Sequence, residues 1–171
     1  MKGLTMDVPL TIGALARRAE TIHGRREVVS RRPSKELERR TYGETVRRAR
    51  QLSAALGALG VRPGDRVATL GWNHVQHLEA YIGIPLAGAV LHTLNLRLHP
   101  DDLAYIAADA GDAVVLVDES LLPLLAQFRN RAAFRHVIVM QRSVDVPVGM
   151  LDYEALVAAH APVPQSADTP D

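Results

Sequence analysis

Short apolar segments alternate with segments of helical periodicity through the middle of the chain. Residues 113–117 and 136–140 are almost continuously apolar, which is typical of strands covered on both faces. Residues 65–70 and 89–93 have the composition of two further strands. Because a helical segment separates each strand from the next, parallel pairing through crossover connections is expected. The pattern therefore predicts an α/β fold with a mostly parallel sheet and helices on both faces.

The helical segments carry their own boundary signals. The clearest helix begins at Thr41, where Thr41 and Glu44 have the spacing of a capping box, and it ends at Gly60. Asn73 is predicted to cap the next helix, and Pro85 to end or bend it. We expect helices over residues 11–22, 41–59, 74–86, 100–110, 120–131 and 152–160.

The two ends of the chain differ from its middle. Residues 27–30 and 38–42 flank a turn at Pro33 and Ser34, which predicts a pair of strands. Residues 161–171 contain three prolines and no apolar periodicity, so we expect a linker or frayed end there. Residues 1–160 are expected to form one folded unit, and a chain that stops in a linker is expected to come from a longer polypeptide.

Composition narrows the class of protein. Apolar residues make up 47% of the chain and charged residues 23%, the balance of a soluble globular protein. No apolar run approaches the roughly 20 residues that cross a bilayer, and no secretory signal is visible. The chain has no cysteine, which excludes disulfides and thiolate chemistry. A cytoplasmic protein without a transmembrane segment is expected.

Charge is divided unevenly along the chain. Residues 1–50 hold 13 Lys and Arg against 6 Asp and Glu, whereas residues 51–171 hold 7 against 13. Paired arginines are one pattern of a nucleic-acid-binding arm. However, Tyr42 is the only aromatic residue of the first 50, so no stacking platform for bases is visible. We therefore expect solvated faces or ion pairs with the acidic half, and no nucleic-acid partner.

No motif in the chain completes a catalytic, cofactor-binding or metal site. The glycines at 57, 60 and 64 follow a helix and precede a strand, which is the reverse of a phosphate-binding loop. His74 and His77 are three residues apart with Glu79 nearby, and His92 and His99 could converge on them, but no second paired motif supports the three ligands that a zinc site needs. The simpler interpretation of the histidine pair is an exposed helical turn whose imidazoles cap the helix or pack against neighbours. No nucleophile elbow is present.

Three stretches give the chain a family resemblance: Gly-Asp-Arg-Val-Ala-Thr-Leu-Gly-Trp-Asn at 64–73, His-Leu-Glu-Ala-Tyr at 77–81, and Gly-Ala-Val-Leu-His-Thr-Leu-Asn at 88–95, followed by Arg97 and Leu98. In this order they resemble the N-terminal part of acyl-CoA synthetases of the adenylate-forming ligase superfamily. The medium- and long-chain fatty-acid–CoA ligases are the most similar branch. Leu96, where the family usually has proline, and Ile82-Gly83 depart from the pattern.

The resemblance implies a fold, a reaction and an incomplete site. The fold would be the N-terminal portion of the ligase large domain. The parent enzyme would use ATP, Mg²⁺ and coenzyme A to convert a fatty acid through an acyl-adenylate into its thioester. In relatives the phosphate loop, the magnesium-binding glutamate and the catalytic lysine lie beyond the position of Asp171, so this chain is expected to be an inactive scaffold. Relatives also use this region for homodimer contacts, so the resemblance implies the same role here. The alternative is a stand-alone α/β interaction module.

The resemblance also directs attention to a few side chains at an interface or at the rim of an acyl pocket. These candidates are Trp72, Asn73, His74, His77, Tyr81 and Asn95. Each has a simpler structural explanation: Trp72 and Tyr81 can serve core or rim packing, and Asn73 can serve as a helix cap.

Overall fold

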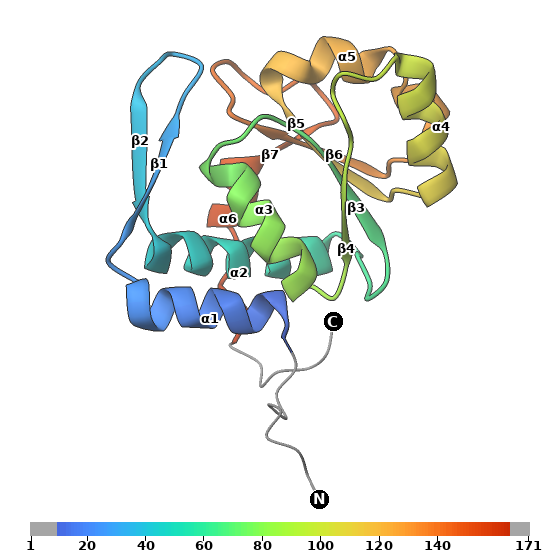
Figure 1. Cartoon of the computed structure of the whole chain (residues 1–171). Coiled ribbons are helices and arrows are strands. Elements are labelled where there is room, and N and C mark those ends of the chain that lie inside the picture. Colours follow the sequence, from blue (N-terminus) through green and yellow to red (C-terminus); the bar gives the residue numbers. More distant parts are fainter. Residues whose placement is uncertain (1–9, 165–171) are drawn as a thin grey trace, which may run out of the picture.

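The computed structural model describes residues 10–164, and its centre is a five-stranded parallel sheet (Figure 1). The strand order is β4-β3-β5-β6-β7, and every neighbouring pair is parallel. The strands are β3 (Arg66–Leu70), β4 (Val90–Thr93), β5 (Val114–Asp118), β6 (His136–Met140) and β7 (Leu151–Asp152). The predicted parallel sheet is confirmed, with the two-residue β7 as an addition that the pattern did not indicate.

Helices cover both faces of the sheet, as expected (Figure 1). One face carries α2 (Tyr42–Ala58), α3 (Val75–Leu86) and α6 (Tyr153–Ala158), with α1 (Ile12–His23) packed on α2 and α3 as an outer layer. The other face carries α4 (Pro100–Ala110) and α5 (Leu122–Ala126). No described helix is long and apolar enough to span a membrane.

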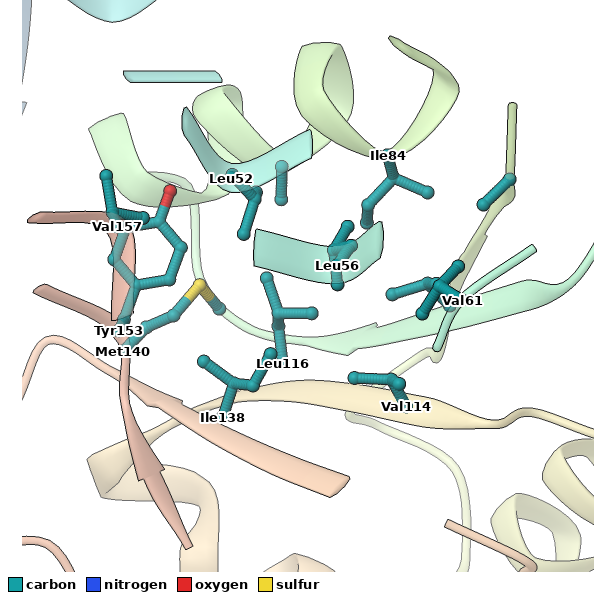
Figure 2. Close-up of a cluster of buried hydrophobic side chains, with 13 residues drawn as sticks. Leu52, Leu56, Val61, Ile84, Val114, Leu116, Ile138, Met140, Tyr153 and Val157 are labelled. Carbon is teal, nitrogen blue, oxygen red and sulfur yellow. The ribbon is translucent and has the colours of Figure 1, made fainter. Parts of the chain in front are cut away.

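The core beneath α2 and α3 shows why these segments fold as they do (Figure 2). Leu52 and Leu56 lie one turn apart on α2 and face Leu116 and Ile138 of the central strands. All four side chains are fully buried. Burial of such a side chain contributes about 1.5–3 kcal/mol, so the apolar periodicity that predicted α2 is also what attaches it to the sheet.

Antiparallel strands β1 (Glu27–Arg31) and β2 (Leu37–Thr41) form a separate hairpin beside the sheet (Figure 1). This pairing was predicted. The capping box is also confirmed, because the Thr41 hydroxyl accepts from the Glu44 amide and the Glu44 carboxylate accepts from the Thr41 amide. Pro85 lies within α3, which ends one residue later.

Two helix predictions were wrong. His74, not Asn73, caps α3, because its Nδ1 accepts from the His77 amide at 3.2 Å. The single helix expected over 120–131 is instead α5 flanked by two short 3-10 turns, Glu119–Leu121 and Arg129–Arg131. Pro123 has no amide proton to donate to the turn before it, and Phe128 leaves helical geometry to become buried between α4 and α5.

A buried ion-pair cluster joins the basic and acidic halves of the chain. Glu79 of α3 is completely buried and accepts from Arg40 Nη1 at 2.6 Å and Arg48 Nε at 2.8 Å. Tyr153 donates its hydroxyl to the same carboxylate at 2.8 Å, and burial raises the pKa of that hydroxyl well above its usual value. Glu154 accepts from Arg48 at 2.8 Å. The internal pairing expected from the uneven charge is confirmed for these arginines.

Candidate functional site

The order of the strands creates a crevice at the carboxyl end of the sheet. From β3 the chain passes through α3 to β4 on one side, and from β5 it passes through α5 to β6 on the other side. Since α3 and α5 lie on opposite faces, the connections that leave the adjacent strands β3 and β5 diverge. In open α/β sheets, ligands bind at such a switch point.

A cavity of about 520 Å³ lies at this point. Its walls come from the segments that follow β3, β5 and β6, and the tip of the β1–β2 hairpin closes one side. The lining side chains that bear on its chemistry are Arg31, Arg32, Trp72, His74, Asp118 and Gln141. Small-molecule sites are commonly about 300–1,000 Å³, so the volume suits a small organic ligand.

A buried His–Asp pair lies in the wall of the crevice. Asp118, the last residue of β5, accepts from His74 Nε2 at 2.7 Å and from the Trp72 amide at 2.8 Å. Because His74 Nδ1 accepts from the His77 amide, the ring proton resides on Nε2. Both side chains are almost fully buried. The pair thus fixes the segment between β3 and α3 to the end of β5.

His77 supports this segment from behind. Its Nδ1 donates to the Trp72 carbonyl at 3.0 Å, and its Nε2 accepts from the Thr69 hydroxyl at 3.0 Å. Burial lowers the pKa of His77, so the ring is held in its neutral form. The ring also meets Tyr81 edge to face at 5.0 Å between centroids. Both histidines are buried, so the expected exposure of this turn was wrong, whereas the expectation that the imidazoles cap or pack is confirmed: His74 caps α3 and His77 packs on Tyr81.

The part of the wall that follows β5 and β6 is also fixed in place. Glu119 Oε2 accepts from the Ser143 amide at 2.7 Å and from the Ser143 hydroxyl at 2.6 Å. These hydrogen bonds lower the pKa of Glu119, with the hydroxyl as the largest cause. Gln141 has a left-handed backbone, φ +52°, and the Gln76 side-chain oxygen accepts from its amide at 2.8 Å. A non-glycine residue in this conformation is strained and is held by its surroundings.

The structure brings together only some of the sequence candidates. Trp72, Asn73 and His74 line the crevice, and His77 lies one layer behind it. Tyr81 lies on the exposed side of α3, and Asn95 follows β4, where its side chain accepts from the Arg97 amide. With about half of their surface exposed, Trp72 and Tyr81 are rim rather than core residues.

Sequence reasoning missed Asp118 and Gln141, although one signal was present. Asp118 is the polar residue at the end of the most apolar strand, and Gln141 directly follows β6. Polar side chains at the carboxyl ends of parallel strands meet along one edge of the sheet. Gln141 gave no sign of its unusual backbone, because glutamine seldom occupies that region.

A metal-binding role for the histidines is not supported within residues 10–164. There, no group of three or more His, Asp or Glu side chains could hold a metal ion. His92 pairs with Asp112 at 2.9 Å and His99 with Asp101 at 3.3 Å, rather than with His74 or His77.

Comparisons with known proteins agree on one family. The model of the AMP-binding enzyme family matches residues 15–171. A long-chain-fatty-acid–CoA ligase of Thermus thermophilus is 47% identical over 91% of this chain and 29% of its own length. A medium-chain-fatty-acid–CoA ligase of Ectopseudomonas oleovorans is 39% identical over 92% of this chain and 30% of its own length.

A solved structure supports the fold. An anthranilate CoA ligase in complex with anthranoyl-AMP superposes with a TM-score of 0.81 at 22% identity, covering 98% of this chain and 30% of that chain. The present chain thus spans about 30% of the length of the curated ligases described above. With a family model that extends from residue 15 to residue 171, the chain belongs to the AMP-binding enzyme family.

Proposed function

We propose that this chain is the N-terminal framework of an AMP-forming acyl-CoA ligase that acts on a medium- or long-chain fatty acid. The observation that carries the proposal is the 47% identity to a fatty-acid–CoA ligase across nearly the whole chain. The complete enzyme would form an acyl-adenylate from ATP, with Mg²⁺ neutralising phosphate charge, and transfer the acyl group to coenzyme A. We place this enzyme in the cytoplasm.

The contribution of these residues is to support a site completed elsewhere. Residues 161–171, expected to be a linker, lie mainly outside the described part, which ends at residue 164. The sheet and its two helical layers supply a packed wall, while the reactive groups would come from the remainder of the ligase. We therefore expect the chain alone to be inactive.

The test is a direct assay. The purified chain is incubated with ATP, Mg²⁺, coenzyme A and a fatty acid, and acyl-CoA and pyrophosphate are measured. No product is expected from the chain alone, and turnover is expected once the downstream part of the ligase is supplied on the same polypeptide. Steady turnover by the chain alone would overturn the scaffold role, and an inactive full-length protein would count against the ligase assignment.

We also propose that α3 forms a homodimer contact, because this helix buries its charged residue and presents an uncharged, largely apolar side outward. Its one charged residue, Glu79, is completely buried. The residues at the spacing of the opposite face are Leu78, Tyr81, Ile82 and Pro85, none of which is buried or charged. A helix that is apolar on its outward side is normally covered. Figure 1 shows α3 on the near side of the molecule.

A second copy of the chain suits this face. In a two-fold contact each residue meets the same surface on its partner, and an uncharged stripe can do so without repulsion. Stable contacts bury about 800 Å² per partner, which is more than one stripe supplies. We therefore expect Ile12 and Leu15 of α1 to take part, since both are exposed and Gly13 packs against Leu86 of α3.

Sedimentation equilibrium tests the dimer. Tyr81→Glu should weaken dimerisation at least about tenfold, because a charge would be buried at the contact. Tyr105→Glu is the matched control, since Tyr105 is exposed on α4 across the sheet. A monomeric wild-type chain, or equal effects of the two variants, would refute the contact. The alternative function, a stand-alone α/β interaction module assembled through charge, would instead show self-association that weakens as salt is raised.

A further inference from the structure

The crevice between β3 and β5 has the features of a built binding site within this chain. It combines a cavity of about 520 Å³, a position at the switch point of the sheet, and a strained Gln141 in its wall. Such strained residues cluster where a ligand is held. The strained residue thus lies in the wall of the cavity that the strand order creates.

Trp72 provides a flat apolar surface in this crevice. It is the only tryptophan of the chain, and half of its surface is exposed although it lines the cavity. Its backbone is fixed on both sides, because its amide donates to Asp118 and its carbonyl accepts from His77. An indole that is carried on a fixed backbone and left partly open is suited to stack on a planar ring.

Charge is arranged asymmetrically around that surface. Arg31 and Arg32 line the cavity from the hairpin tip, and each is anchored through Nε, to the Lys35 carbonyl and to Glu38 respectively. Asp118 and Glu119 line it from the sheet. A negatively charged group would be repelled by the two carboxylates and attracted to the guanidinium groups, which bind carboxylate, phosphate or sulfonate groups by charge-assisted hydrogen bonds.

We propose that the crevice binds a small organic anion that carries a planar aromatic ring. The ring stacks on Trp72, and the anionic group lies at the hairpin tip against Arg31 and Arg32. The carboxylates of Asp118 and Glu119 orient the ligand by excluding its anionic end from the sheet side. This binding requires neither ATP nor the downstream part of a ligase, so it is independent of the proposed enzymatic function.

The indole N–H of Trp72 is a single reporter for the experiment. In ¹H–¹⁵N NMR spectra of the chain, its one cross-peak is followed during titration with three probes: 2-naphthalenesulfonate, which has both ring and anion; 2-naphthol, which has only the ring; and methanesulfonate, which has only the anion. We expect saturable shifts with 2-naphthalenesulfonate, binding of 2-naphthol weaker by about tenfold, and no shift with methanesulfonate. The backbone peaks of the hairpin tip should move together with the indole peak.

Variants distinguish binding at this site from non-specific binding. Arg31→Gln combined with Arg32→Gln should weaken binding of 2-naphthalenesulfonate by about tenfold and leave that of 2-naphthol unchanged. Arg39→Gln is the control, because Arg39 belongs to the same hairpin but pairs with Glu27 and does not line the cavity. The proposal is overturned if 2-naphthalenesulfonate leaves the indole peak in place, if 2-naphthol binds equally well, or if Arg39→Gln has the same effect as the double variant.

Discussion

Glu79 offers a stringent test of how the two halves of the chain are held together. The change Glu79→Gln keeps the shape of the side chain and an oxygen that can accept from Tyr153, but it removes the negative charge. Arg40 and Arg48, with side chains only 16% and 14% exposed, would then face a neutral group. A buried cation without its counter-charge is strongly unfavourable.

The magnitude follows from the contacts that remain. Removing one partner of a buried ion pair costs about 3–5 kcal/mol. Arg48 would keep Glu154 at 2.8 Å and Arg40 would keep Glu38 at 2.6 Å, so the lower end, about 3 kcal/mol, is expected. For a chain of 171 residues, this lowers Tm by about 6–12 °C.

Urea unfolding followed by circular dichroism measures the change in free energy. Glu27→Gln is the matched control, because Glu27 pairs with Arg39 on the surface with both side chains about half exposed. An exposed pair of this kind contributes less than about 1 kcal/mol. If Glu79→Gln and Glu27→Gln cost the same within error, the buried cluster does not stabilise the fold in the way argued.

Three further predictions concern packing, protonation and helix capping. Gly83→Ala should destabilise the fold by about 1–3 kcal/mol, because the new Cβ would lie 2.6 Å from the Ala49 carbonyl oxygen. Gly57→Ala, where the space is open, should stabilise the fold by about 0.5–1 kcal/mol. Urea midpoints in the opposite order would contradict the close packing of α2 on α3. Burial lowers the pKa of His77, so as pH falls below about 6.5 the unfolded state takes up a proton that the folded state does not, and stability should decrease. His77→Gln should therefore flatten the dependence of the urea midpoint on pH. The same pH dependence in the variant and the wild type would be evidence against a neutral ring. Thr41→Ala should cost about 1 kcal/mol through loss of the capping box, visible as a lower Tm, and an unaltered Tm would show that the cap is dispensable.

The parts of the fold that could be predicted are those whose signals are local. The capping box at Thr41 needs only residues three positions apart, and the helix expected over 100–110 is observed with those bounds. The apolar run that became β5 is fully buried, as its composition required. In each case the residues that decide the structure are close together along the chain, so the local sequence pattern is enough to predict the element.

The errors arose where a distant residue decides a local choice. Asn73 and His74 are both able to cap α3, and the choice falls on His74 because Asp118, 44 positions away, holds its ring. Likewise the helix expected over 120–131 is interrupted where Phe128 enters the core between α4 and α5. Helix propensity and residue spacing do not indicate either of these long-range contacts.

The crevice itself is a product of topology. Trp72 and Asp118 are 46 positions apart, and they meet because β5 pairs with β3 on the side opposite β4. The sequence indicates that strands alternate with helices, but this alternation is equally compatible with β5 lying beyond β4. In that order β3 and β5 would not be neighbours, and Trp72 and Asp118 would not meet at a switch point. The strand order therefore decides whether these polar residues form a site. Direct evidence that Trp72 and the hairpin arginines act on one ligand would test the cavity as well as the chemistry, because these side chains come from different elements and line the same space.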